Sequence, residues 1–193
     1  GARNGGEAAA AAGARFIHMS AGVVVAGRGR AYTETDMPDA ISDYGRWKLE
    51  AEDAAHQMHP GVLAVRTSLL YGTERMGHVQ KDVAQVMVGH SRMKFFTDEY
   101  RCPAHAADVA AAIVGLADRR EITGVLHVAG PHTVSRAHLA QAFAGWLGYD
   151  PIGVPTTTLG ESGLHRPGMV ALDCSRAAAM GIRCRSLEEA LGR

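Results

Sequence analysis

The sequence contains no long apolar run and carries no net charge. Its 20 Lys and Arg residues balance its 20 Asp and Glu residues, which argues against a cationic surface for nucleic acid or anionic lipid. No apolar stretch approaches the ~18 residues that a membrane-spanning helix needs, and no basic segment precedes an apolar one as in a secretion signal. We therefore expect a cytoplasmic protein without a membrane or nucleic-acid partner.

Cysteine is also scarce. The three cysteines, Cys102, Cys174 and Cys184, are odd in number and widely spaced, a pattern that favours reduced thiols over a disulfide framework or a CxxC metal site. The ten histidines form no HxH or HxxxH pair, so we expect no metal site.

What is present is an alternation of apolar segments with two periods. Residues 16–20, 62–72 and 125–130 predict buried strands, the second of which continues into a loop. Helical spacing or strong helix formers cover residues 7–12, 76–93, 106–116, 135–147 and a last segment from residue 186. Glycine, proline and polar residues mark 26–41 and 151–168 as loops. The alternation predicts an α/β fold with a parallel sheet.

One further predicted helix carries a reactive pair. It starts at Ser42 or Asp43, ends before Pro60, and places Tyr44 and Lys48 one turn apart on the same face. A lysine ammonium beside a phenol stabilises the phenolate, which makes the tyrosine usable as a proton donor or acceptor in catalysis. The alternative is a solvated helix face, because both residue types are common there.

The order of several short motifs resembles one family. A strand ending at Ser20 is followed by Val23-Val24-Val25-Ala26-Gly27, Glu34-Thr35-Asp36, Tyr44-Gly45-Arg46-Trp47-Lys48 and Arg66-Thr67-Ser68-Leu69-Leu70-Tyr71-Gly72. In this order they resemble the extended short-chain dehydrogenase/reductases, and most of all the dTDP-4-dehydrorhamnose reductase branch of sugar-nucleotide enzymes. The resemblance covers essentially the whole chain. It implies part of a Rossmann-like parallel sheet, its C-terminal half, with a small mixed substrate-binding lobe.

The opening part of that fold is missing from the sequence. A dinucleotide-binding fold begins with a strand, a glycine-rich turn and a helix that holds the pyrophosphate, whereas no predicted helix follows Gly27 and Gly29. We therefore expect residues 1–75 to be the C-terminal half of the dinucleotide-binding domain. Residues 76–193 would form the substrate-binding lobe, with 104–130 returning to the first domain. NADP or NAD is the expected cofactor of the complete protein, bound weakly or not at all by this chain alone.

The resemblance also assigns roles to individual residues. Tyr44 would exchange a proton with the substrate, while Lys48 would assist it and contact the nicotinamide ribose. Thr67 and Ser68 would lie against the nicotinamide, and Arg101 would meet a phosphate or sugar. The alternatives are strand hydroxyls bonded locally and an arginine on the surface.

The position of a catalytic hydroxyl depends on how the motifs are aligned. Anchored on the strand at 16–20, the family's hydroxyl falls on Ala21, which has none. Counted back from Glu34-Thr35-Asp36, it falls on Ser20, which is our third catalytic candidate. Gly22, where this branch often carries Asp, is a second departure.

These features predict an NAD(P)-dependent reductase or epimerase-like enzyme that acts on a nucleotide sugar. Its partner would be that small molecule, and homodimer formation fits the family. The rival is a non-catalytic regulatory protein on the same fold that binds a sugar nucleotide or dinucleotide. Ala21, Gly22 and the missing glycine-rich turn favour the rival, whereas the intact pair of Tyr44 and Lys48 favours the enzyme.

Overall fold

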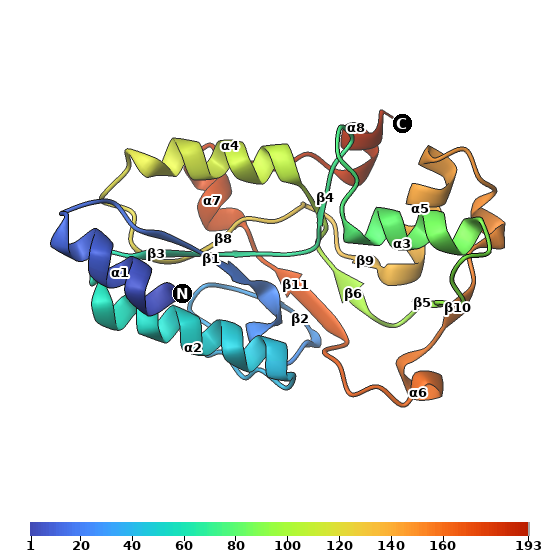
Figure 1. Ribbon diagram of the computed structural model, residues 1–193, viewed down its shortest axis with the longest axis horizontal. Coiled ribbons are helices and arrows are strands. Elements are labelled where there is room, and N and C mark those ends of the chain that lie inside the picture. The colour runs from blue at the N-terminus through green and yellow to red at the C-terminus, as the bar shows by residue number, and fades with distance from the viewer. Residues whose placement is uncertain (193) are drawn as a thin grey trace.

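The chain folds as alternating strands and helices, and the computed structural model describes residues 1–192 (Figure 1). A parallel sheet with the strand order β1-β3-β8 lies in one half of the molecule. Its strands are Ile17–Ala21, Leu63–Thr67 and Gly124–His127. The register pairs Ala21 with Thr67, so β1 and β3 end at the same edge of the sheet. The predicted α/β fold with parallel strands is confirmed.

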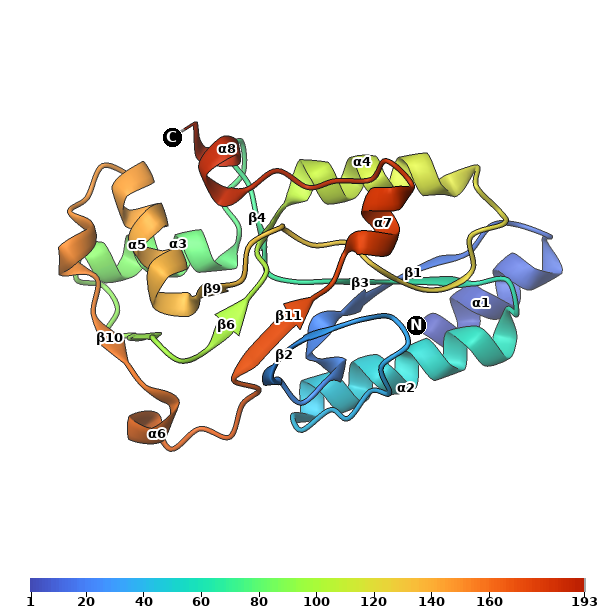
Figure 2. The ribbon, with the colours of Figure 1, turned by 180° about the vertical axis from the view of Figure 1, so that it is seen from behind.

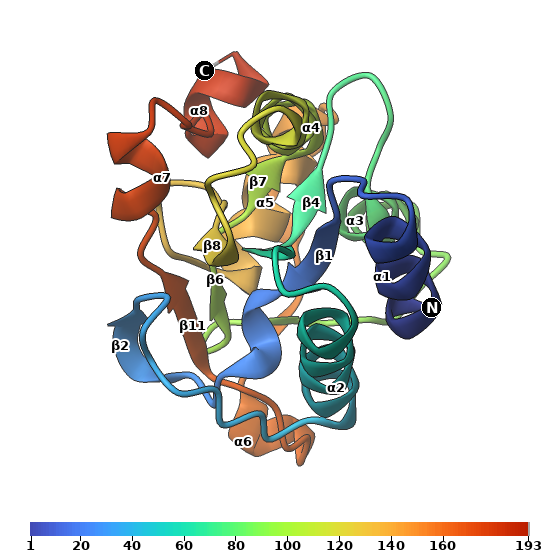
Figure 3. The same cartoon turned by 90° about the vertical axis from the view of Figure 1, so that its left-hand side faces the viewer.

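Helices cover both faces of this sheet. α2 (Asp43–Met58) lies on one face, with α1 (Ala2–Ala11) packed beside it, and α4 (Ala106–Ala117) lies on the other, as the end-on view shows (Figure 3). The core between sheet and α4 includes Leu63, Val65, Leu126, Val109, Ala112, Leu116 and Ala177, the last from α7 (Ser175–Ala179). These strands are apolar on the α4 face because that face is wholly covered.

A second, four-stranded sheet joins the two halves of the molecule in the order β2-β11-β6-β9. Its strands are Arg28–Tyr32, Met169–Leu172, Tyr100–Arg101 and Val134–Ser135. β11 runs between β2 and β6 and is parallel to both (Figure 2). The prediction of a loop over residues 26–41 is wrong for β2, because its pairing partner lies near the other end of the sequence.

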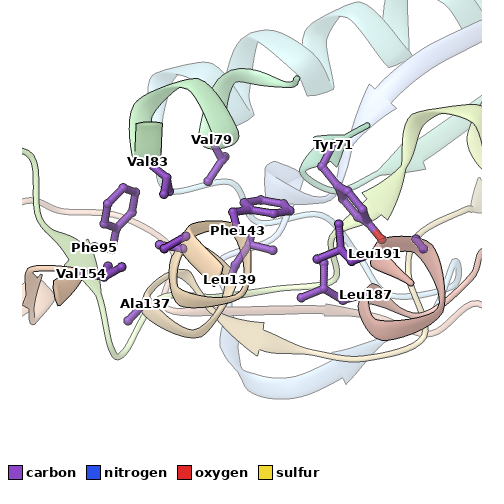
Figure 4. Close-up of a cluster of buried hydrophobic side chains, with 13 residues drawn as sticks. Tyr71, Val79, Val83, Phe95, Ala137, Leu139, Phe143, Val154, Leu187 and Leu191 are labelled. Atoms are coloured by element: carbon purple, nitrogen blue, oxygen red, sulfur yellow. The ribbon is translucent and has the colours of Figure 1, made fainter. Parts of the chain in front are cut away.

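The second half of the molecule is built on helix packing. α3 (His78–Met87), α5 (Arg136–Trp146) and α8 (Leu187–Leu191) surround one apolar cluster (Figure 4). Its large members are Tyr71, Val79, Val83, Phe95, Leu139, Phe143, Val154, Leu187 and Leu191. Each helix contributes residues three or four positions apart, the spacing that gives a helix one apolar face.

Short elements complete the structure. They are the 3-10 turns η1 (Gly22–Val24) and η2 (Pro151–Gly153), the strand pairs β4 (Leu70–Tyr71) with β7 (Ala104–His105) and β5 (Phe95–Phe96) with β10 (Thr156–Thr157), and α6 (Leu159–Ser162). The loop predicted over 151–168 therefore contains three of them. Asp150 accepts from the Ile152 amide and Thr158 from the Glu161 amide, so side-chain caps order this segment.

Within residues 1–192, the three cysteines are free thiols. Over the same range, no helix is long and apolar enough to cross a membrane, and no three or more His, Cys, Asp or Glu side chains gather in a way that could hold a metal ion.

A buried ion pair attaches α2 to the sheet. Glu52 of α2 is 2% exposed and Arg66 of β3 is 3% exposed. Arg66 donates from Nε to Oε1 at 3.0 Å and from Nη2 to Oε2 at 2.7 Å, the two-pronged geometry that suits guanidinium and carboxylate. Ser20 of β1 donates to the same carboxylate. One side chain of α2 is therefore bound to two neighbouring strands.

We expect Glu52→Gln to lower the free energy of unfolding by about 3–5 kcal/mol, because it leaves the Arg66 charge buried without a counter-charge. Denaturant unfolding followed by circular dichroism measures the change. Glu121→Gln is the matched control: Glu121 lies 3.5 Å from Arg119 and its side chain is 70% exposed, so its effect should be close to zero. Equal effects of the two substitutions would contradict the role given to the buried pair.

Candidate active site

A small cleft lies at the carboxyl ends of β1 and β3. Its volume is about 130 Å³, and its lining includes Ala21, Tyr44, Thr67, Ser68 and Arg101. In parallel α/β sheets ligands bind outside the carboxyl ends of the strands. Four of the six residues selected from the sequence therefore line one cleft: Tyr44, Thr67, Ser68 and Arg101. The other two, Lys48 and Ser20, do not line it.

Tyr44 and Lys48 lie on α2 as their spacing predicts. Tyr44 occupies the first turn, lines the cleft and is 57% exposed. Lys48 donates from Nζ to the carbonyl oxygen of Met19 at 2.6 Å, so its ammonium is held against the backbone of β1. The Tyr44 phenol, which is open to the cleft, can pass a proton to a ligand oxygen.

Gly45 lets α2 approach the 3-10 turn η1 closely at this point. A Cβ atom on Gly45 would lie 2.3 Å from the carbonyl oxygen of Val23, closer than any real contact. Ser42 caps the helix by accepting from the Gly45 amide at 3.1 Å. The cap and the missing side chain together fix where the first turn begins, and hence where Tyr44 lies.

Ser20 does not face the cleft. It is 4% exposed, and its hydroxyl donates to Glu52 in the buried cluster under α2. Ala21, the next residue, lines the cleft instead, because successive residues of a strand face opposite sides. The hydroxyl of Ser20 is thus used within the core.

The hydroxyls of Thr67 and Ser68 differ in their partners. Ser68 Oγ accepts from the Cys102 amide at 3.1 Å, which is the local bonding considered as the alternative for both. Thr67 is 7% exposed, and its Oγ1 is buried without a hydrogen-bond partner. Of the two, only Thr67 has a hydroxyl with no hydrogen-bond partner at all, whereas Ser68 Oγ still has its O–H free to donate.

Arg101 is a buried residue, so its interpretation as a surface arginine is wrong. It is 5% exposed, and its guanidinium donates to four groups of the protein: the carbonyls of Tyr100, Pro167 and Gly168 and the Glu99 carboxylate, at 2.7–3.0 Å. Burial lowers the pKa of Arg101 to about 10, and the Glu99 carboxylate opposes that shift. The observed contacts tie residues 167–168 to β6.

A larger hollow of about 600 Å³ lies in the second half of the molecule. Three cations line it, Lys94, Arg136 and Arg166, together with Phe96 and the carboxylates of Asp82 and Glu161. Arg136 Nε is buried without a partner, and burial lowers the pKa of Arg136 while Glu99 raises it. Glu99 lies 3.4 Å from Arg166 and 2.8 Å from Arg101, so it connects the hollow with the cleft.

The sequence interpretation missed this hollow. Its cations are about thirty to seventy residues apart and form no motif, so only their three-dimensional placement reveals them. The buried, unpartnered nitrogen of Arg136 is the clearest sign of a ligand, because a buried donor on a charged group is costly unless an anion or another acceptor reaches it.

The half-buried thiols of Cys174 and Cys184 lie in a separate cavity of about 520 Å³. Burial raises the pKa of Cys174 to about 12 and that of Cys184 to about 11. Both are therefore protonated at neutral pH, and neither is suited to act as a nucleophile.

The chain is similar in sequence to a known family and to several curated proteins. The family described as the RmlD substrate binding domain matches residues 1–193. Methionine adenosyltransferase 2 subunit beta of Bos taurus is 32% identical over 186 residues, a match that covers 92% of this chain and 56% of that protein. The dTDP-4-dehydrorhamnose reductase of Mycobacterium tuberculosis is 35% identical over 153 residues, covering 75% of this chain and 49% of that protein.

Solved structures of similar fold include dTDP-4-dehydrorhamnose reductases. The one from Bacillus anthracis, in complex with NADP, has a TM-score of 0.87 at 26% identity and covers all of this chain and 69% of that one. The one from Clostridium acetobutylicum has a TM-score of 0.85 at 26% identity, covering 98% and 68%. The chain spans about half the length of the curated relatives it matches.

We expect Gly45→Ala to lower the free energy of unfolding by about 1–3 kcal/mol, because the added methyl forces α2 away from Val23. Gly115→Ala is the matched control inside α4, where an added Cβ meets nothing within 4 Å; there the change should stabilise the protein by about 0.5–1 kcal/mol. Denaturant unfolding of both variants measures the difference, and a neutral Gly45→Ala would contradict the close approach.

Proposed function

This chain belongs to the family of the RmlD substrate binding domain, and we propose on that basis that it forms part of an NAD(P)-dependent reductase acting on a nucleotide-linked sugar. One observation carries the proposal: an exposed Tyr44 lines a cleft at the carboxyl ends of two parallel strands, and Lys48 follows it one turn along α2. The reductases among its relatives support the choice of reaction.

The proposed reaction reduces a sugar carbonyl to an alcohol. The π bond of the carbonyl breaks, its carbon gains a hydride and its oxygen gains a proton. A reduced nicotinamide, when bound, supplies the hydride and is thereby oxidised. Tyr44 gives its phenolic proton to the oxygen, Lys48 stabilises the phenolate that remains, and water restores the proton.

The residues present fit the nicotinamide end of such a cofactor. The strand ends at Ala21 and Thr67 form an open-sided cradle beside Tyr44. In this proposal Lys48 contacts the ribose, and Ser68 lies in the wall beside the ring. Within residues 1–192, β1 is followed by η1 and β2 and not by a glycine-rich turn and helix, so the pyrophosphate would need groups from elsewhere.

The larger hollow is the proposed binding site of the substrate diphosphate. Arg136, Arg166 and Lys94 line it together with the ring of Phe96, and a diphosphate would give the Arg136 nitrogen the acceptor it lacks. Arg101 acts indirectly in this arrangement: with Glu99 it fixes the segment that carries Arg166.

A non-catalytic regulatory subunit is the second candidate. Two observations favour it: the cleft has Ala21 where the family carries a hydroxyl, and methionine adenosyltransferase 2 subunit beta is among the relatives. The two candidates differ in whether Tyr44 has any catalytic effect.

We expect Tyr44→Phe to reduce turnover of dTDP-4-dehydrorhamnose by about 10²–10⁴-fold, because only the proton-transferring oxygen is lost. NADPH affinity should remain nearly unchanged. Activity is assayed on the protein as its gene encodes it, by the loss of reduced-nicotinamide absorbance. No turnover by either protein would favour the regulatory candidate, whereas equal non-zero turnover by the two would remove Tyr44 from the proposed reaction.

We expect Arg136→Met to weaken binding of dTDP to the 193-residue chain by about 10–100-fold, the loss typical of a hydrogen bond to a charged group. Isothermal titration calorimetry measures the affinity. Arg119→Met, which removes an arginine paired with exposed Glu121, is the control and should bind as the unmodified chain does. Equal affinities in all three would remove the hollow from the proposal.

A further inference from the structure

Thr67 holds an unused hydroxyl at the candidate active site. Its side-chain oxygen is buried and has no partner, and it is the one such oxygen or nitrogen among residues 1–192 that belongs to a residue lining the cleft. Buried polar atoms are almost always hydrogen-bonded, so an exception needs an explanation. A ligand oxygen in the cleft would supply the missing partner.

The position of Thr67 is also significant. It is the register partner of Ala21 across β1 and β3, and adjacent strands are about 4.8 Å apart. The Thr67 side chain therefore begins one strand away from Ala21, the position at which the cleft lacks a hydroxyl. A donor at either position can reach an oxygen between the strand ends and Tyr44.

We propose that Thr67 Oγ1 donates a hydrogen bond to the sugar oxygen on which Tyr44 acts, taking the part that a hydroxyl at residue 21 would have. The proposal rests on the proposed reductase function for its ligand. Thr67 then polarises the carbonyl and stabilises negative charge that develops on its oxygen. This differs from the sequence-based expectation, which placed Thr67 against the cofactor.

The other polar groups near the cleft are already engaged. Ser20 donates to Glu52, Ser68 accepts from the Cys102 amide, and the Arg101 guanidinium is bound by Glu99 and backbone carbonyls. Ser20 and Arg101 cannot turn toward a ligand without breaking a bond inside the protein. The Ser68 oxygen is held by the Cys102 amide, although its own O–H can still donate. Thr67 can do so at no such cost, because its oxygen has no protein partner to lose.

A ligand-binding role and a structural role predict opposite effects of one substitution. Thr67→Val keeps the shape of the side chain and removes a buried oxygen that has no partner. The unfolding midpoint of the ligand-free protein should therefore stay the same or rise. Affinity for a ligand that bonds to Thr67 should fall.

The test uses the protein as its gene encodes it and two probes, dTDP-rhamnose and NADPH, titrated separately by calorimetry. Thr67→Val should weaken dTDP-rhamnose binding about ten-fold, the size of one hydrogen bond, and leave NADPH affinity unchanged. Thr67→Ser should restore binding, and adding Ala21→Ser to Thr67→Val should restore part of it. Thr123→Val, which changes an exposed threonine before β8, is the control and should alter neither affinity.

Three results would overturn the role of Thr67: unchanged dTDP-rhamnose affinity in Thr67→Val, an equal loss of NADPH affinity, or an unfolding midpoint that falls together with affinity. Failure of the unmodified protein to bind dTDP-rhamnose would also overturn it. If binding depends on Thr67 but the unmodified protein shows no turnover, the reductase proposal fails and the role of Thr67 in binding the sugar oxygen stands.

Discussion

The geometry of the cleft depends on one buried ion pair, between Glu52 and Arg66. Glu52 lies about two turns after Tyr44 on α2, and a helix transmits its position over that length with little bending. Binding Glu52 to β3 therefore sets both the height and the rotation of Tyr44 relative to the strand ends. The desolvation cost of the two charges is offset by the two-pronged geometry and by a third hydrogen bond from Ser20.

The same ion pair determines which polar groups remain for a ligand. It takes the hydroxyl of Ser20, while strand alternation turns Ala21 toward the cleft. Ser68 is used to hold Cys102. Two hydroxyl groups that line the cleft have no hydrogen-bond partner among the described residues, the phenol of Tyr44 and Oγ1 of Thr67. The packing of the core thus decides which polar groups are free to bind a ligand at this site.

Much of the fold is predictable from the sequence because its strongest signals are local. The apolar run at 16–20 predicts one strand, which the structure has as β1. The helical spacing around Tyr44 predicts one helix, which the structure has as α2. The burial of Glu52 and of Arg101 is not predictable in this way, since partners from distant segments decide it. In the sequence Glu52 looks like any other charged residue of a helix. Only the structure shows that Arg66 lies opposite it.

β11 has a consequence for how the protein is synthesised. Val170 of this strand forms one wall of the cleft, and its neighbour Ala171 pairs with Ala31 from near the start of the chain. Ribosomes add roughly 5–20 residues per second, so β2 waits for many seconds before its partner exists. A nascent chain that stops before residue 169 cannot form the cleft, however well its first sheet has assembled. The cleft is therefore incomplete until β11 has been synthesised.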